Sequence, residues 1–353
     1  MADNSYLALS LIEQGYTGAT GTTPYKPATL FQLEQLQSLY GTAFSSAVSQ
    51  APAGTTQLTL NFDGTQNNKN VIKPGESTTN IGNLNELLPA NRANYLIGIG
   101  ADGVVPGSIE SNLQSTPFNA GPIGQAIVEL AYQDLIEMVN RVREADPTAQ
   151  IELNLTGFSR GGAEAVAFAN LVNELGIPGV FAPGAVTINS LVLFDPVDET
   201  NGALNTSWPT NIRNSLVLVA MDETRSIFPP MPVGSDAIVL GVPGAHSDVG
   251  GSFGTTGISS VTLGIARNFL AASGVPISEV PSSRRPDFDV LPEARMGGYG
   301  VKLLKAFEQW CANRNVVEIS LGVNSGAAFE VVGRFIARVG YTKVGENFVK
   351  EMI

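Results

Sequence analysis

Short stretches of the chain have the hydrophobic pattern of β-strands. Two of them, 57–62 and 151–155, alternate apolar and polar positions with a period of two. Others are continuous apolar runs, which is typical of strands buried on both faces of a sheet. The expected strands are 57–62, 94–98, 151–155, 190–194, 215–221 and 237–242.

Helical spacing of apolar residues marks several of the segments between and beyond these strands. Residues 126–145 are strongly amphipathic and stop at Asp146-Pro147, which is a common way for a helix to end. The other expected helices are 30–39, 261–272 and 301–313. Because strands alternate with helices, the pattern predicts an α/β fold with a largely parallel central sheet and helices on both faces.

The pattern divides the chain into a core and two additions. Residues 56–275 carry the alternating strands and helices of the core, preceded by a helical and loop extension at 1–55. Residues 276–353 form a C-terminal addition of unknown role, ending as strand, helix and strand. Within the core, 100–124 is rich in Gly and Pro without periodicity, so we expect a long loop there.

The stretch 151–172 has the pattern of a strand, a sharp turn and a helix, with the letters GFSRG at 157–161. A serine in such a turn can act as a nucleophile, because the turn lifts its hydroxyl above the end of the sheet. Gly157 and Gly161 allow the strand and helix to approach each other closely. Ser159 is therefore the candidate nucleophile, and the alternative is a serine that only caps the following helix.

A second match to the same five-letter pattern lies at 250–254, around Ser252. This match follows no apolar strand and leads into more glycine and threonine rather than a helical pattern. We interpret it as a loop and retain Ser159.

His246 is the only histidine in the chain, and it follows the apolar run 237–242 in a glycine-flanked loop. A serine nucleophile needs a base that works near neutral pH, and imidazole is the usual one. If Ser159 is a nucleophile with a histidine base, His246 must be that base. A lone histidine is otherwise more often structural or exposed to solvent.

The base in turn needs a carboxylate to orient it. Asp195 and Asp222 both end apolar strands, and Asp195 is favoured because it follows four apolar residues and precedes a proline. The order Ser159, Asp195, His246 is also the chain order of α/β-hydrolases. Asp222 is expected to pair at the surface with Arg225 instead. Asp248 is expected to brace the glycine-rich loop through an Asx-type hydrogen bond.

An oxyanion hole requires two backbone donors. The amide of Arg160, directly after the nucleophile, supplies one, and the loop after an earlier strand supplies the other, here at Gly64. Asp63 in the same loop is either a turn-forming residue or a supporting acid.

Composition limits the classes of partner. The 353 residues include 20 basic and 32 acidic side chains, which give a formal net charge of −12. This charge argues against nucleic acid as a partner and against bulk attraction to anionic lipid. A single cysteine, Cys311, excludes an internal disulfide and a Cys-rich metal site, and the chemistry proposed above needs neither a metal nor a cofactor.

Targeting signals are not evident in the sequence. The first residues lack a basic region followed by an apolar stretch, and no run approaches 18 apolar residues, so neither a Sec-type signal nor a transmembrane helix is expected. We therefore expect a protein that is cytoplasmic in the producing cell and that leaves it, if at all, by another route.

The motifs together resemble a known family, the lipase effectors of type VI secretion systems with an α/β-hydrolase domain. The resemblance covers roughly residues 57–272. It is carried by NFDGTQNN at 61–68, TGFSRGGAEA at 156–165, LFDPV at 193–197, AMDETRSIFPP at 220–230 and PGAHSDVGGSF at 243–253. It implies an α/β-hydrolase fold with Ser159 as nucleophile, Asp195 as orienting acid and His246 as base.

The resemblance also implies a function, which is that of a lipase or phospholipase A secreted as an antibacterial effector. Such a protein would act on a lipid ester and would have a carrier in the secretion apparatus and an immunity protein. The alternatives are an esterase for a soluble or polysaccharide-linked ester, and a non-catalytic component of a secretion or phage-like particle.

Overall fold

The computed structural model describes residues 30–102, 120–198 and 202–286, apart from 224, 226, 227, 229 and 255. It also describes three strands nearer the C-terminus, at 318–322, 342–344 and 347–351. Gln35–Pro286 belongs to one compact unit and the three C-terminal strands to another, so each is considered by itself. The expected boundaries at 55/56 and 275/276 stay predictions.

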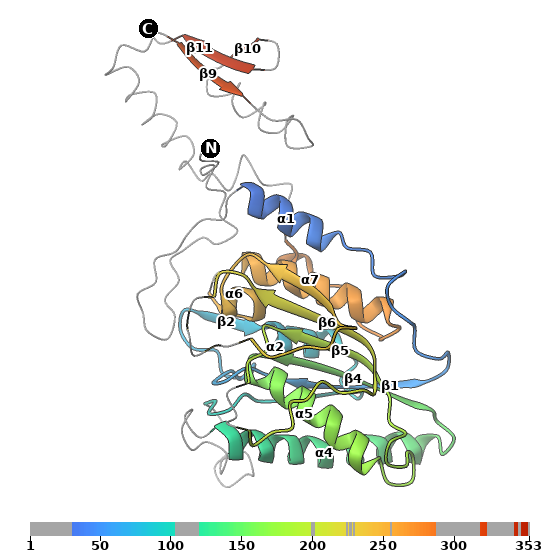
Figure 1. Ribbon diagram of the computed structural model, residues 1–353. Coiled ribbons are helices and arrows are strands. Elements are labelled where there is room, and N and C mark those ends of the chain that lie inside the picture. Colours follow the sequence, from blue (N-terminus) through green and yellow to red (C-terminus); the bar gives the residue numbers. More distant parts are fainter. Residues whose placement is uncertain are drawn as a thin grey trace. The chain divides into compact units, whose positions relative to one another are not determined.

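The larger unit is built on a six-stranded parallel sheet with the strand order β3-β1-β4-β5-β6-β7 (Figure 1). The predicted parallel α/β sheet is therefore confirmed. The strands are β1 (Thr56–Phe62), β3 (Ala93–Leu96), β4 (Ile151–Phe158), β5 (Ile188–Phe194), β6 (Ile212–Ala220) and β7 (Ile238–Val242). Because β1 connects to β3 on one side and β4 lies on its other side, the direction of winding reverses between β1 and β4. Open α/β sheets bind their ligands at such a point, at the carboxyl ends of the strands.

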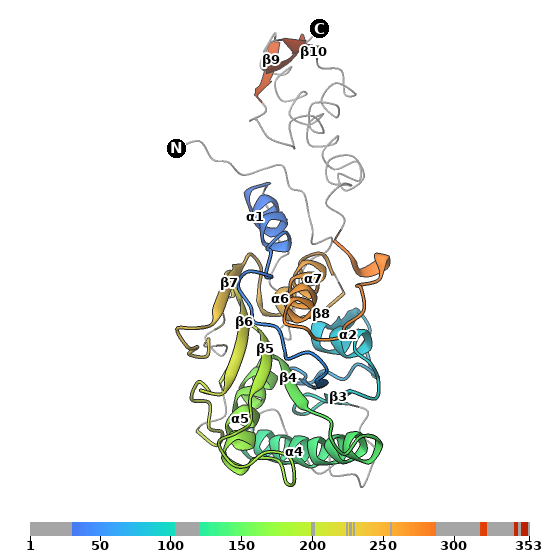
Figure 2. The same ribbon diagram turned by 90° about the vertical axis from the view of Figure 1, so that its right-hand side faces the viewer.

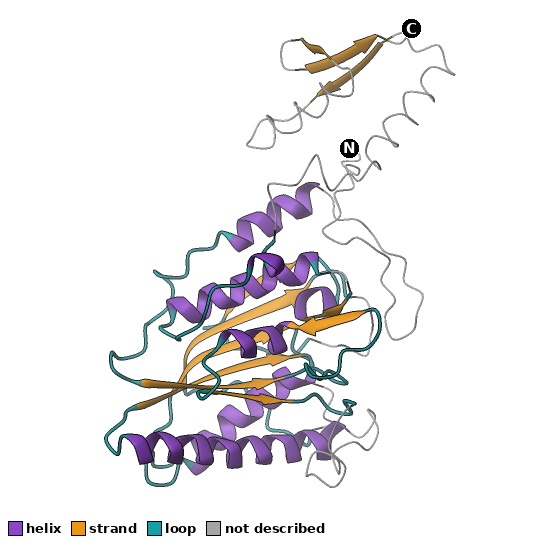
Figure 3. Ribbon diagram, turned by 180° about the vertical axis from the view of Figure 1, so that it is seen from behind, coloured by secondary structure: helices purple, strands orange, loops and turns teal. Residues whose placement is uncertain are grey.

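Helices cover both faces of this sheet (Figures 1, 2 and 3). The helices α4 (Ala120–Ala145) and α5 (Arg160–Leu175) lie on one face, and α2 (Asn80–Leu87) and α7 (Gly257–Ala272) lie on the other. The end of α1 (Leu30–Tyr40) packs on α7, where the ring of Tyr40 occupies the space beside Gly264.

Glycines set the close packing around the predicted elbow. A Cβ atom on Gly157 would lie 2.6 Å from the carbonyl oxygen of Gly161. A Cβ atom on Gly161 would lie 2.4 Å from the carbonyl oxygens of Phe62 and Asp63. The start of α5 is therefore pressed against the ends of both β4 and β1, which brings the loops after these two strands together.

Several element boundaries differ from the prediction. The helix α4 begins at Ala120, so residues 120–124 are helical and not part of a loop, while 103–119 lie outside the described residues. Pro122 misled the interpretation, although proline is accepted in the first turn of a helix, where its missing N–H is not needed.

The segment around Ser252 is also not a loop. Gly251–Phe253 forms a short strand, β8, that pairs antiparallel with β2 (Glu76–Thr79). Ser252 has a φ of 86° on this strand, far from a strand–turn–helix context. The loop expected around His246 is a one-turn helix, α6 (His246–Gly250).

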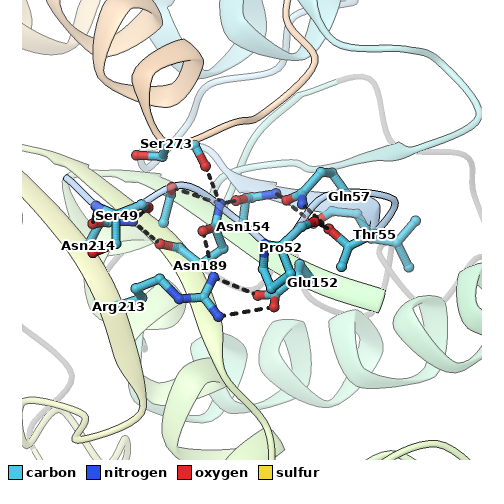
Figure 4. A network of polar contacts seen from close by, with 12 residues as sticks. Ser49, Pro52, Thr55, Gln57, Glu152, Asn154, Asn189, Arg213, Asn214 and Ser273 are labelled. Atoms are coloured by element: carbon cyan, nitrogen blue, oxygen red, sulfur yellow. Dashed lines mark hydrogen bonds and ion pairs between the residues drawn. The ribbon is translucent and has the colours of Figure 1, made fainter. Parts of the chain in front are cut away.

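Buried polar side chains line the amino ends of the central strands (Figure 4). Arg213 makes two hydrogen bonds with Glu152, at 2.9 and 3.0 Å, and a third with the Asn189 side chain at 2.8 Å. Asn189 in turn donates to Asn154, which donates to Gln57. This chain of contacts joins β1, β4, β5 and β6 at the edge of the sheet opposite the elbow.

The C-terminal strands form their own antiparallel sheet in the order β10-β11-β9. They are β9 (Glu318–Gly322), β10 (Thr342–Val344) and β11 (Asn347–Glu351). Before this sheet, a 3-10 turn, η1 (Ser282–Arg284), belongs to the larger unit. The helix expected at 301–313, with Cys311, lies outside the described residues.

Candidate active site

The elbow after β4 holds Ser159 in a strained conformation. Its φ is 57° and its ψ is −130°, a region that non-glycine residues rarely occupy. The surroundings fix this backbone, because the Ser159 amide donates to Phe194 and its carbonyl accepts from Val197. The side chain makes no capping hydrogen bond to α5, so the alternative interpretation as a helix cap is wrong.

Asp195 lies directly beyond the neighbouring strand end and is bonded to His246. Phe158 of β4 pairs with Phe194 of β5, which puts Ser159 and Asp195 at adjacent strand ends. Asp195 Oδ2 lies 2.7 Å from Nδ1 of His246, and both side chains are buried. The Ala220 amide donates to the other oxygen of Asp195 at 2.8 Å, so the carboxylate is held from two sides.

Two aromatic rings contact the imidazole of His246. The ring centroids of Phe158 and Phe228 lie 4.7 and 4.5 Å from that of His246. Since Phe158 precedes Ser159, the imidazole lies beside the elbow. Among the described residues no hydrogen bond joins the Ser159 hydroxyl to His246; the bond from Nδ1 to Asp195 leaves Nε2 as the nitrogen that can accept the serine proton.

The second acid considered, Asp222, supports the loop that precedes His246. Its Oδ2 atom accepts from the Gly244 amide at 2.9 Å. The expected pair between Asp222 and Arg225 is wrong, because the Arg225 guanidinium bonds both oxygens of Glu223, two residues away. Asp195 is the acid that contacts the histidine ring.

Glu223 was missed in the sequence, and it accepts from the backbone N–H of His246 at 3.2 Å. Burial opposes its ionisation, but the hydrogen bonds and the charge of Arg225 prevail and lower the pKa of Glu223 to about 2. A charged Glu223 therefore stands at the start of α6, where a carboxylate interacts favourably with the helix end.

Asp248 has the bracing contact expected of it. Its Oδ2 atom accepts from the Ala245 amide at 2.9 Å and so closes the turn that leads into α6. Burial raises the pKa of Asp248 to about 6, with a contribution from the charges of Asp222 and Glu223.

Asp63, at the end of β1, is fully buried in a cluster of hydrogen-bond donors. Its Oδ1 atom accepts from the Gly64 amide at 2.7 Å, and Oδ2 accepts from the hydroxyls of Thr79 and Tyr95 at 2.8 and 2.5 Å. Burial raises the pKa of Asp63 to about 6, although all three donors lower it. Thr79 and Tyr95 were missed, because nothing in a single sequence links them to Asp63.

This cluster bears on the expected oxyanion hole. The Gly64 N–H is donated to Asp63, so a role for it in binding an oxyanion requires that bond to be released. The roles of Gly64 and of the Arg160 amide stay predictions. Asp63 itself contacts the donors of its own loop and of two neighbouring elements.

Glu164, one turn into α5, is a buried carboxyl that the sequence interpretation did not single out. Within the described part of the chain, neither of its oxygens has a hydrogen-bond partner. Burial raises the pKa of Glu164 well above its ordinary value; the charge of Arg160 opposes this and that of Asp63 adds to it. Glu164 therefore lies close enough to Asp63 and Arg160 to respond to the charges beside the elbow.

The described residues include no group of three or more His, Cys, Asp or Glu side chains that could hold a metal ion. None of the helices in this part of the chain is both long and apolar enough to cross a membrane.

The chain is similar to known proteins only among solved structures. No protein-family model matches the chain, and no curated protein matches it. An uncharacterized protein from Pseudomonas aeruginosa is 20% identical to this chain, with a TM-score of 0.44. The aligned region covers 92% of this chain and 58% of that protein. This chain thus spans less than two thirds of that protein.

Two other solved structures show a likeness of similarly low degree. The Tle1 effector, solved bound to the VgrG spike of the type 6 secretion system, is 17% identical with a TM-score of 0.42, covering 86% of this chain and 68% of its own. Carboxyl esterase 2 from Tuber melanosporum is 11% identical, with a TM-score of 0.34. The aligned region covers 64% of this chain and 78% of the esterase. The parallel six-stranded sheet, the strained serine elbow after β4 and the histidine after β7, the last strand of this sheet, define an α/β-hydrolase fold.

Proposed function

We propose that this protein is a serine ester hydrolase with Ser159 as nucleophile, His246 as general base and Asp195 as the orienting acid. The observation that carries the proposal is the 2.7 Å contact between Asp195 and Nδ1 of His246, at the same sheet edge as the strained Ser159. A buried carboxylate on Nδ1 fixes the imidazole tautomer that has an unprotonated Nε2.

The mechanism follows from this arrangement. Ser159 Oγ attacks the ester carbonyl carbon and transfers its proton to Nε2 of His246, while the carbonyl π electrons move onto oxygen. The tetrahedral intermediate then expels the alcohol, which takes the proton from Nε2 and leaves an acyl group on Ser159. Water attacks this acyl group with His246 as base, and release of the acid returns the proton to Ser159.

Backbone amides of Arg160 and of the loop at 63–65 are proposed to stabilise the oxyanion. Asp63 orders that loop through its bonds to Gly64, Thr79 and Tyr95. Phe158 and Phe228 hold the imidazole and exclude water from its ring, which strengthens its bond to Asp195.

The proposed substrate is a lipid ester, cleaved by phospholipase A or lipase chemistry. The support is the ordered set of motifs at 61–68, 156–165 and 243–253, which resembles type VI lipase effectors. By the same resemblance we propose export without a Sec signal, a carrier in the secretion apparatus and a cognate immunity protein.

A fluorophosphonate probe tests the catalytic serine directly. The chain offers a matched control, because Ser252 lies in a second copy of the five-letter pattern. Folded wild type and Ser252→Ala are expected to be labelled, and Ser159→Ala is not. Equal labelling of all three proteins would refute Ser159 as the nucleophile, and no labelling of folded wild type would favour the non-catalytic alternative.

The substrate class needs a second assay with the same three proteins. Release of fatty acid from phospholipid vesicles by wild type, but not by Ser159→Ala, would support the lipase. Hydrolysis of a short-chain p-nitrophenyl ester without any action on vesicles would support the soluble-ester alternative.

A further inference from the structure

The loop after β6 carries an ion pair, Glu223 with Arg225, that no step of the proposed mechanism uses. The Arg225 guanidinium donates to both oxygens of Glu223, at 2.9 Å from Nε and 2.7 Å from Nη2. The Arg225 amide donates to the same carboxylate at 2.8 Å. The side chains are only 8% and 27% exposed, Glu223 being the more buried. A buried ion pair brings little net stability, because desolvation offsets the attraction, so its other contacts are more informative than its charge.

Each member of the pair contacts a different part of the surroundings of His246. The Oε2 atom of Glu223 accepts from the His246 backbone N–H at 3.2 Å. The Arg225 guanidinium lies over the ring of Phe228, 4.1 Å from its centroid, which is a cation–π contact. The Phe228 ring in turn lies 4.5 Å from the imidazole, centroid to centroid. The contacts therefore form a closed path that holds His246 by its backbone and by its ring.

The two rings beside the imidazole are supported differently. Phe158 belongs to β4 and is 1% exposed, so the sheet holds it in place. Phe228 lies in the loop after β6 and is only partly buried. Its amide donates to the Arg225 carbonyl at 3.1 Å, and its ring packs on the Arg225 guanidinium. The position of Phe228 therefore depends on Arg225, which Glu223 orients.

We propose that Glu223 and Arg225 are positioning residues for His246. They hold the Phe228 ring against the imidazole and anchor the backbone beneath it, so that Nε2 is presented to Ser159. A single hydrogen bond at Nδ1 lets the imidazole tilt, and a second ring contact restricts that tilt. The inference rests on the proposed role of His246 as base, and the pair itself takes no part in proton transfer.

Two measurements on the full chain test this inference. His246 is the only histidine, so labelling with ¹⁵N-histidine gives a single set of imidazole signals in the NMR spectrum. These signals report the tautomer and mobility of the ring whether or not the protein is an enzyme. The rate constant for labelling of Ser159 by a fluorophosphonate reports its reactivity.

The variants are Glu223→Gln, Arg225→Gln, the double variant and the conservative Arg225→Lys. Arg267→Gln is the matched control, because it also removes an ion pair, the 2.5 Å contact with Glu279, from a helix on another part of the sheet. Circular dichroism checks that each variant folds.

Each single Gln variant at the pair is expected to lower the labelling rate about tenfold, because a small displacement of a catalytic group is costly. The imidazole signals should broaden or show a second tautomer. The double variant should lose no more than about twofold beyond either single one, since the two residues act as a unit. Arg225→Lys should recover part of the rate, because it keeps the charge but not the two-pronged hydrogen bond. Arg267→Gln should match wild type in both measurements.

The inference is overturned if the Gln variants are labelled like wild type, or if their labelling slows while the imidazole signals stay unchanged. An equal loss in Arg267→Gln would also overturn it. No labelling of folded wild type would overturn the hydrolase and this inference together, whereas unchanged imidazole signals in variants that are still labelled would overturn only this one. If Arg225→Gln does not fold, Phe228→Leu tests the same ring contact, and a similar loss is expected.

Discussion

The two edges of the central sheet differ in their polar groups, because strained and unpartnered residues occur at the carboxyl edge. At the amino edge, Arg213, Glu152, Asn189 and Asn154 bond one another in a continuous network (Figure 4). At the carboxyl edge, Ser159 and Asp195 have positive φ values of 57° and 40°, and Glu164 has no partner among the described residues.

This difference distinguishes residues that stabilise the fold from residues that we propose take part in catalysis. Strained residues and carboxyls with raised pKa values gather where a site needs them, because a catalytic group must be held in a geometry that the chain would not choose alone. Paired buried polar groups at the other edge fix the register of four strands and are expected to matter only for folding. Substitutions at the two edges should therefore change different quantities.

The largest effect is expected at Asp195. Asp195→Asn should leave the fold intact and lower kcat by about 10⁴-fold, because an amide favours the wrong imidazole tautomer. Asp222→Asn is the control, and it should change kcat by less than about tenfold, since the side chain of Asp222 hydrogen-bonds, within the described residues, to the Gly244 amide and not to His246. Steady-state kinetics on a soluble ester measures both. Comparable losses in the two variants would remove the distinction between the acids.

A substitution at the amino edge should reduce stability without touching the chemistry. Arg213→Met leaves Glu152 buried without its ion pair, which is expected to cost about 2 kcal/mol and several degrees in Tm. The turnover number of the folded fraction should stay within about twofold of wild type, as the residue is remote from the elbow. Thermal unfolding and kinetics on the same sample give both values. A large fall in kcat with an unchanged Tm would contradict the division between the edges.

The positions of the strands along the chain and the approximate site could be predicted because local pattern determines them. Apolar runs ending in Asp195 and preceding His246 identified the carboxyl edge, and the structure brings these two residues into contact. The short elements α6 and β8 could not be predicted, because their glycine-rich sequences have neither a helical nor a strand period.

Contacts between segments that are distant in the chain could not be predicted from the sequence, for a different reason. Tyr95 and Thr79 reach Asp63 only after β1, β3 and the start of α2 have packed, and no spacing along the chain encodes that meeting. The burial of Glu164 could not be predicted either, because a glutamate in the first turns of a helix is normally exposed. The sequence also could not decide between Asp222 and Glu223 as the partner of Arg225, because both lie within three residues of it.

Glu164 provides a pH-dependent test of the carboxyl edge. Its raised pKa means that the folded protein binds a proton which the unfolded chain has released, so its contribution to stability is lost as pH rises above the ordinary value of 4.5. Glu164→Gln cannot ionise, and its Tm advantage over wild type should therefore be larger at pH 8 than at pH 5.

Asp63 and Asp248 also titrate in this range, and the charge of Asp63 contributes to the raised pKa of Glu164, so the difference between wild type and variant reports Glu164 together with its coupling to Asp63. A gain of about 1.4 kcal/mol at pH 8 is expected for each unit by which burial raises the pKa of Glu164, because glutamine stays neutral without binding a proton. A Tm difference that is the same at both pH values would show that Glu164 does not titrate as a buried carboxyl.

The smallest effect is expected from removing a single hydroxyl at each edge. Tyr95→Phe deletes the donor to Asp63 and an acceptor for the Lys69 amide, and should cost about 1 kcal/mol of stability while raising the pKa of Asp63 further. Because Asp63 orders the loop proposed to bind the oxyanion, kcat should also fall about threefold to fivefold. Tyr132→Phe is the matched control, since within the described part of the chain its hydroxyl donates to the Gly176 carbonyl at the far end of α5 and to no other group. It should lose similar stability with kcat unchanged, and an equal kcat for the two variants would separate Asp63 from catalysis and leave it as a purely structural residue.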